Sequence, residues 1–85
     1  MGKYEIRFKP KVEKDCRKIP KPIVGTILDK IEGLKDNLAG DIKKLTNFTP
    51  EYRLRCGNYR VLFEVDGQAI VVYRILHRKE AYLKI

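Results

Sequence analysis

The residues best suited to chemistry begin with the segment Tyr52-Arg53-Leu54-Arg55-Cys56. Apolar and cationic side chains alternate there at period two, which is typical of a half-buried β-strand. Arg53 and Arg55 are therefore expected to project together from one face of the strand, while the apolar side chains pack on the other face.

A third arginine, Arg60, follows Gly57-Asn58, which is a two-residue turn signal between strands. A hairpin with this turn pairs Arg55 with Arg60 on one face. Like charges directly opposite are destabilising, and a bound phosphate would neutralise them because guanidinium groups present forked donors to phosphate oxygens. Neutralisation by Glu51 and Glu64 in a surface network is the alternative.

The basic segment His77-Arg78-Lys79-Glu80-Ala81-Tyr82 supplies further candidates. Arg78 and Tyr82 are expected at the mouth of the same face, where a tyrosine can stack on a base or donate a hydrogen bond. His77 can carry protons near neutral pH, although a single histidine among basic residues is more often a surface residue without a role. Tyr52, Tyr59 and Tyr73 are expected to be core or rim aromatics rather than surfaces on which a base stacks.

These side chains describe a site that needs no metal or cofactor. The sequence contains no carboxylate pair placed for glycosidase chemistry, no glycine-rich phosphate loop, no HExxH motif and no evident Ser-His-Asp arrangement. Arginines and a tyrosine suit cleavage of RNA by its own 2′-OH, which requires a base, cations that stabilise the phosphorane, and an acid for the leaving 5′ oxygen. Because arginine stays protonated in proteins, Arg53 and Arg55 are suited to charge stabilisation and are poor bases.

The elements that precede this segment are a strand and two helices. Residues 4–8 alternate apolar and charged, which predicts a half-buried strand. Pro10 opens a short helix that ends near Pro20, and Pro22 opens a second helix with Gly40 as its stop signal, so the two form an αα-hairpin. Their apolar faces are formed by Val12, Cys16 and Ile19 in the first helix and by Ile23, Val24, Ile27, Leu28, Ile31, Leu34 and Leu38 in the second.

The rest of the chain predicts strands over residues 52–56, 59–65 and 69–76, joined by tight turns at Gly57-Asn58 and Asp66-Gly67. Consecutive strands of this kind form an antiparallel β-meander of three to four strands, which the helices must cover on one face. The last strand is nearly all apolar and is expected to be buried on both faces. We expect an α+β fold in which one domain spans residues 1–85.

The composition limits the classes of protein to which the chain can belong. Its 85 residues are 44% hydrophobic and 35% charged, and the hydrophobic share excludes intrinsic disorder. The longest apolar run, residues 69–73, is far shorter than the ~20 residues of a membrane span, and no secretion signal is evident, so we expect a cytoplasmic protein. Cys16 and Cys56 fit neither a disulfide framework nor a zinc site and are expected in the core.

The net charge of +8 favours a polyanionic partner such as nucleic acid, an acidic protein or an anionic membrane surface. The charge is uneven: the first 42 residues carry ten basic and seven acidic side chains, and the remaining residues carry nine and four. A basic surface kept only for solubility is the alternative.

The segment from Tyr52 to Val65, Tyr-Arg-Leu-Arg-Cys-Gly-Asn-Tyr-Arg-Val-Leu-Phe-Glu-Val, resembles the Tyr-Arg-x-Arg-x-Gly-x-Tyr-Arg-Val-x-Tyr core of the RelE/ParE toxin superfamily. The ending from His77 to Tyr82 is similar to the superfamily's terminal His-Arg-Arg-x-x-Tyr. The N-terminal strand, the helical hairpin and Lys43-Lys44-Leu45 also follow the family's order. The resemblance therefore covers nearly the whole chain.

For RelE-like members, the resemblance implies a toxin of a type II toxin–antitoxin pair that cleaves mRNA in the ribosomal A site, without metal or cofactor. Arg53 and Arg55 would occupy two basic positions that are lysines in the best-studied members, where one is proposed as the general base. Arg60 would hold the scissile phosphate, Arg78 would stabilise charge or act on the leaving group, and Tyr82 would stack on or orient the nucleotide.

Because arginine stands where those members have lysine, the identity of the general base is open, and either His77 or the ribosome could supply it. Lys43, Lys44 and Lys79 would bind RNA. The implied partners are the ribosome, mRNA and an acidic RelB-like antitoxin, which would wrap the basic face and either displace the C-terminal segment or cover the arginines. No membrane is implied.

Two other functions fit the same resemblance. A ParE-like toxin would bind DNA gyrase and cut nothing, but such members usually lack the full set of basic residues and tyrosine found here. A non-enzymatic basic binding protein on the same fold would bind RNA in a salt-dependent way without cleaving it.

Overall fold

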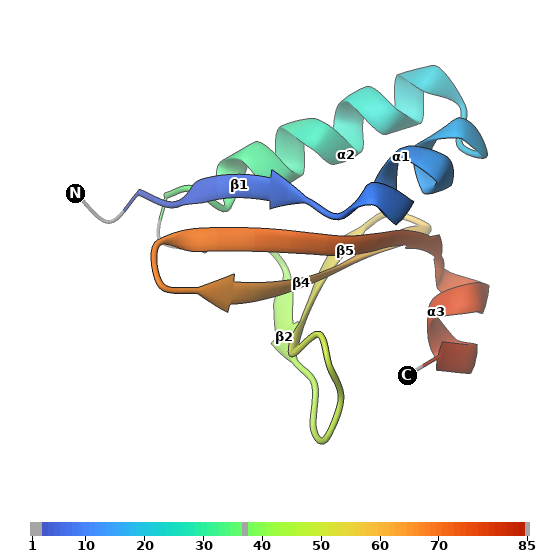
Figure 1. Ribbon diagram of the computed structural model, residues 1–85. Coiled ribbons are helices and arrows are strands. Elements are labelled where there is room, and N and C mark those ends of the chain that lie inside the picture. The colour runs from blue at the N-terminus through green and yellow to red at the C-terminus, as the bar shows by residue number, and fades with distance from the viewer. Residues whose placement is uncertain (1–2, 37, 85) are drawn as a thin grey trace.

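Eight helices and strands make up the part of the chain that the structure describes, residues 3–36 and 38–84 of a computed structural model (Figure 1). In chain order they are β1 (Glu5–Phe8), α1 (Pro10–Arg17), α2 (Lys21–Gly33), β2 (Ile42–Lys44), β3 (Tyr52–Cys56), β4 (Tyr59–Asp66), β5 (Ala69–His77) and α3 (Arg78–Lys84). No helix within these residues is long and apolar enough to cross a bilayer.

The strands form a five-stranded sheet in the order β1-β5-β4-β3-β2. Strands β2 to β5 are antiparallel neighbours, which confirms the expected meander, and β1 joins its edge in parallel to β5. α1 and α2 lie together on one face of this sheet, and α3 follows the C-terminal end of β5 (Figure 1). The α+β class expected from the sequence is confirmed.

The helical hairpin is confirmed, but α2 is shorter than expected. It ends at Gly33 rather than close to Gly40. Glycine is a poor helix former, and here the N–H of Leu34 donates to the Ile31 carbonyl oxygen at 2.9 Å, a 3₁₀-type bond that tightens the last turn. The segment from Leu34 to β2 is therefore irregular, and it includes Leu38 in the left-handed region at φ 58°.

The main core lies between the two helices and the sheet. Ile27, Ile31 and Leu34 are at most 1% exposed and pack with buried residues of β3 and β4. Ile23 and Leu28, expected on the same helix face, are 38% and 40% exposed. Leu28 is displaced by about 100° from Ile27 around the helix axis. Ile23 lies in the first turn, where it lines a surface groove instead.

The two cysteines belong to this core region, as expected. Cys56 is buried and Cys16 is half-buried, and both are free thiols. Burial raises the pKa of both thiols, and the charge of Asp15 adds to the effect at Cys16. These side chains therefore behave as small apolar groups.

A smaller cluster lies on the opposite face of the sheet, which α1 and α2 leave uncovered. It is formed by Leu45, Leu62, Leu76 and Ala81, with Phe48 packed beside them. Leu45 and Phe48 come from the connection between β2 and β3, and Ala81 comes from α3. The helix α3 was not predicted from the sequence, and it fixes the basic C-terminal segment on this second face.

Strand β5 contains a bulge. Leu62 pairs with Arg74 and Phe63 pairs with Val72, so Tyr73 has no partner on β4. Val72 and Ile75 both pack into the helix-side core. The bulge therefore places Tyr73 and Arg74 together on the other side and reverses the alternation of side chains in the rest of β5.

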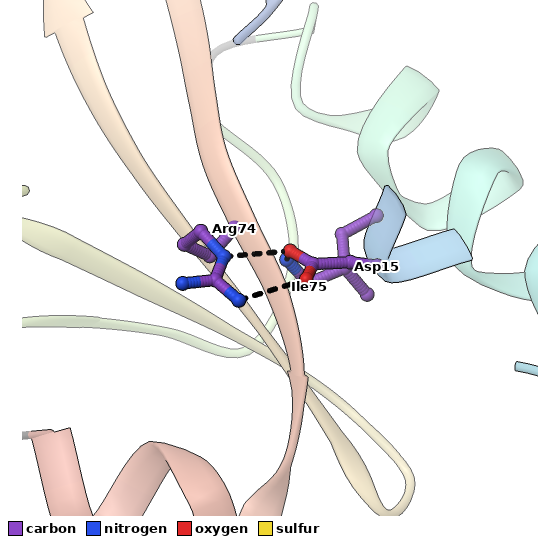
Figure 2. A network of polar contacts seen from close by, with 3 residues as sticks. All are labelled: Asp15, Arg74 and Ile75. Atoms are coloured by element: carbon purple, nitrogen blue, oxygen red, sulfur yellow. Dashed lines mark hydrogen bonds and ion pairs between the residues drawn. The ribbon is translucent and has the colours of Figure 1, made fainter. Parts of the chain in front are cut away.

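A buried carboxylate from α1 secures the strand next to this bulge (Figure 2). Asp15 is 5% exposed and accepts two hydrogen bonds from Arg74, from Nε and Nη2, each at 2.8 Å, and one from the backbone N–H of Ile75 at 3.0 Å. Burial alone would raise the pKa of Asp15, but the hydrogen bonds from Arg74 and Ile75 and the charges of Arg74 and Lys18 outweigh it, so the pKa is lowered. β1 pairs with β5 only as far as Val72, and the Asp15 contacts continue the attachment beyond that point.

Candidate functional site

The uncovered face of the sheet holds a cleft of about 450 Å³ near the ends of β3, β4 and β5. Its lining consists of five cations, one aliphatic residue and one tyrosine: Lys43, Arg53, Arg55, Arg60, Arg78, Leu45 and Tyr82. No carboxylate is among them. The concentration of positive charge makes this cleft a site for an anion.

The register of the strands brings the cations together in pairs. Arg55 lies directly opposite Arg60, as expected from the Gly57-Asn58 turn. Lys43 of β2 lies directly opposite Arg53 in the same way. Directly opposed residues of antiparallel strands share a face, so all four side chains lie on the cleft side.

Arg60 is the most firmly held of these cations. It is only 5% exposed, and its Nη1 donates to the carbonyl oxygens of Gly57 and Tyr59 at 2.8 and 2.9 Å. Both bonds use the same terminal nitrogen, so the donors on Nε and Nη2 are not used by them. The guanidinium is therefore positioned by the backbone of the β3–β4 turn.

The two glutamates named as the alternative means of neutralising this cluster, Glu51 and Glu64, are not among the cleft residues. Glu51 is 3.7 Å from Lys44, and Glu64 forms no ion pair with any described residue. An acidic residue that the sequence did not single out, Asp41, lies 3.9 Å from Arg55. Both partners of that pair are about 60% exposed, so its contribution is small, and the charge of the cleft remains largely uncompensated.

Tyr82 is placed at the mouth of the cleft by α3. Tyr82 is 67% exposed, and the guanidinium carbon of Arg60 lies 6.0 Å from its ring centroid. Hydrogen bonding to Arg60 and the charge of Arg60, followed by the charges of Arg78 and Arg55, lower the pKa of the Tyr82 hydroxyl. The cleft therefore stabilises the ionised form of this phenol relative to a tyrosine in water.

His77 does not lie in the cleft. It pairs with Tyr59 on the helix side of the sheet, where the two rings meet edge to face at 5.4 Å. Its Nδ1 accepts a hydrogen bond from the Lys79 backbone at 3.2 Å. It lines a separate hollow of about 80 Å³ together with Asp15 and Glu80. The structure thus separates His77 from the arginines, because the β5 bulge reverses its side.

The three lysines expected to bind RNA do not all lie in the cleft. Lys43 lines the cleft, whereas Lys44 lines another hollow beside Glu51. Lys79 is exposed on α3 and is not among the cleft residues. Within residues 3–36 and 38–84, no group of three or more His, Cys, Asp or Glu side chains is arranged to hold a metal ion.

Comparisons with known proteins agree with one another. The family model described as ParE toxin of type II toxin–antitoxin system, parDE, matches residues 6–82. The chain is 34% identical to Toxin RelE3 of Methanocaldococcus jannaschii, over 92% of this chain and 94% of that protein. It is 31% identical to the protein named Putative toxin RelE1 of the same organism, over 94% of this chain and 96% of that protein.

Solved structures show the same relationship. The RelB–RelE antitoxin–toxin complex from Methanococcus jannaschii contains a chain similar to this one at a TM-score of 0.75 and 38% identity, covering 89% of this chain and 94% of that one. The RelBE2 complex from Mycobacterium tuberculosis gives 0.76 and 25%, covering 89% and 99%. Taken together with the arginine motif and the fold, these matches show that the chain belongs to the RelE/ParE superfamily, the toxins of type II toxin–antitoxin systems.

Proposed function

We propose that this toxin is a metal-independent endoribonuclease that cleaves mRNA in the ribosomal A site through attack of the RNA's own 2′-OH. The observation that supports the proposal is the cleft itself, in which five cations without a lining carboxylate surround a tyrosine whose pKa is lowered. A phosphodiester with a developing negative charge is the ligand that such a site would stabilise.

In the proposed reaction, the 2′ oxygen forms a bond to phosphorus and the bond from phosphorus to the 5′ oxygen breaks, which leaves a 2′,3′-cyclic phosphate and a 5′-hydroxyl end. Arg60, held by two backbone carbonyls, donates to the phosphate oxygens on which charge accumulates. Arg55 and Arg53 add positive charge from the adjacent strand. Arg78 stabilises the charge on the leaving 5′ oxygen, which takes up a proton from water to become the 5′-hydroxyl.

Tyr82 and Lys43 are the cleft side chains that can accept the 2′ proton, and we assign this role to Tyr82. The arginines around it stay protonated, and His77 lies on the other side of the sheet. A phenol whose pKa is lowered is ionised in a larger fraction of molecules at a given pH, so it is a better proton acceptor in this cleft than in water. The Tyr82 ring can in addition orient the nucleotide by stacking.

The target would be mRNA on the ribosome, so the toxin would act in the cytoplasm. An acidic RelB-like antitoxin would be the inhibitor of the toxin. Relatives have been solved as complexes of RelE with RelB. The net charge of +8 and the uncompensated cleft favour an acidic partner that covers the arginines.

Primer extension on an mRNA translated in a reconstituted system tests the proposal. Cuts at A-site codons that vanish when ribosomes are omitted would support it. Arg60→Ala should remove the cuts, whereas Arg17→Ala, which deletes an exposed arginine of α1 on the other side of the molecule, should keep them. Intact mRNA beside an active RelE-like control would contradict the proposal.

Inhibition of DNA gyrase is the second candidate, because the matching family model is that of a ParE toxin. A supercoiling assay tests it directly. Gyrase inhibition by the wild type that persists in Arg60→Ala would favour this function. Salt-dependent binding of RNA without either activity would instead mark a non-catalytic binding protein.

A further inference from the structure

A second hollow of about 520 Å³ lies on the same face of the sheet as the cationic cleft. Its walls include Pro10, Phe48, Leu62 and Tyr73, with Lys9 and Lys11 at its rim. Unlike the cleft it is mainly apolar, and none of its lining residues is acidic. We refer to it as the apolar groove.

The strand residues that line the groove lie next to those that line the cleft. Leu62 in the groove and Arg60 in the cleft are alternate residues of β4, so their side chains share a face about 7 Å apart along the strand. Phe48 of the groove and Leu45 of the cleft pack in the same small cluster. If one phosphate of an extended polyanion binds Arg60, the neighbouring unit of the same polyanion can therefore reach the groove.

The bulge in β5 shapes one wall of the groove. Alternation from Val72 places Tyr73 on the groove side, and the bulge, which leaves Tyr73 without a partner on β4, turns Arg74 to the same side. Asp15 fixes this arrangement through Arg74 and the Ile75 N–H. Bulges next to functional sites commonly redirect a side chain in this way.

The charges at the groove fit a nucleotide. Lys9 Nζ lies 5.2 Å from the centroid of the Tyr73 ring, so an aromatic face and a cation are held together. Lys11 is exposed and has no ion pair with a described residue. The charge of Arg74 is already compensated by Asp15. A base that stacks on an aromatic ring while its phosphate contacts lysine is the usual mode of single-stranded RNA binding.

We propose that the apolar groove binds a nucleotide that flanks the scissile phosphate, with Tyr73 as the stacking surface for its base and with Lys9 and Lys11 as contacts for its phosphate. This inference rests on the proposed function, since it assigns a further subsite to the same RNA substrate. An acidic segment of a protein partner is the competing occupant, but the aromatic ring of Tyr73 beside the Lys9 cation favours a nucleotide, which offers a base to stack as well as a phosphate.

The test uses fluorescence anisotropy with a labelled RNA dinucleotide and a labelled hexanucleotide, both carrying 2′-O-methyl groups so that neither is cleaved. The wild type should bind the hexanucleotide more tightly than the dinucleotide. We call the ratio of the two affinities the length gain. Tyr73→Leu should reduce the length gain about fivefold or more, because stacking on one aromatic ring is lost, while Tyr73→Phe should keep it. Dinucleotide affinity should change little in both variants.

Charge variants provide the second arm. Lys11→Glu should also lower the gain, whereas Lys21→Glu at the start of α2 makes the same change of charge at an exposed lysine outside the groove and should not. Melting curves by circular dichroism establish that each variant is folded.

Three results would overturn the inference: no length gain in the wild type, an unchanged gain in Tyr73→Leu, or equal losses in Lys11→Glu and Lys21→Glu. An unchanged gain in Tyr73→Leu would leave a protein partner as the occupant to consider. The primer-extension result separates this inference from the proposed function. If the wild type cleaves mRNA but Tyr73→Leu still binds the hexanucleotide more tightly than the dinucleotide by the wild-type factor, the groove subsite is rejected and the proposed function stands.

Discussion

The two faces of the sheet place very different side chains opposite one another. Under α1 and α2, apolar residues are paired across strands, as in Leu54 opposite Val61. On the other face, Lys43 lies opposite Arg53 and Arg55 lies opposite Arg60. The same two strands thus support a packed core on one side and paired like charges on the other, and the paired charges lower stability unless a ligand neutralises them.

Arg60→Ala should produce the largest effect on the uncovered face. Loss of a fixed guanidinium should lower cleavage by a factor of about 100 or more, because a positioned donor to the developing charge is removed. The free energy of unfolding should fall by only about 1 kcal/mol, since the carbonyls of Gly57 and Tyr59 lie at a turn and can bind water. Toxicity in growing cells and urea denaturation measure the two quantities. Unchanged toxicity would show that Arg60 has no role in the toxic activity.

Tyr82→Phe separates the two roles of this side chain. If the hydroxyl accepts the 2′ proton, Tyr82→Phe and Tyr82→Ala should slow cleavage equally, by a factor of about 100. A milder effect of Tyr82→Phe would show that the ring contributes mainly by stacking. Because the cleft lowers the pKa of this phenol, wild-type cleavage should rise with pH, and the midpoint of that rise should lie below the usual tyrosine value near 10.

Asp15→Asn should have the largest effect on stability. Arg74 would lose the charge of its buried partner, and we expect a loss of about 2–3 kcal/mol, less than for a fully buried pair because Arg74 is partly exposed. Glu13→Gln on the same helix removes an exposed ion pair and should cost no more than about 0.5 kcal/mol.

The pH dependence of unfolding sharpens the Asp15 prediction. The folded pKa of Asp15 is lowered, so its contribution is complete above the unfolded value near 3.9 and is lost as the pH falls through the folded pKa. Urea denaturation of the wild type should therefore show a loss of stability below about pH 4 that Asp15→Asn lacks. Identical pH profiles would contradict this assignment.

Cys56→Ser should lower stability less than Asp15→Asn does. A hydroxyl replaces a thiol in the helix-side core, and the cost should be about 1–2 kcal/mol in the free energy of unfolding, with cleavage by the folded fraction unchanged. Cys16→Ser, at a half-buried position, should cost less. A stable but inactive Cys56→Ser protein would place this residue in the chemistry.

Local patterns were sufficient to predict the hairpin that carries the arginines. The alternation in β3 and the Gly57-Asn58 turn together determine that Arg55 meets Arg60. The position of His77 required information that these patterns lack. Strict alternation from Val72 would put His77 on the cleft side, but the unpaired Tyr73 shifts the alternation by one residue and turns His77 toward the helices.

Long-range contacts account for most of what the sequence could not predict. Asp15 and Arg74 are far apart in the chain, and neither periodicity nor composition indicates that they meet. α3 depends in the same way on Ala81, which packs against Leu62 and Leu76 on the sheet. A short basic segment carries little helical signal of its own, because its stability comes from that docking.

The parallel pairing of β1 with β5 has a consequence for the order in which the protein assembles. Glu5 pairs with Ala69, so β1 leaves the ribosome long before its partner strand has been made. Closing so long a loop is slow compared with forming the β3–β4 hairpin. The nascent chain therefore holds β1 and α1 without their final neighbours for most of its synthesis, and the Asp15 attachment to β5 closes only when the meander is complete.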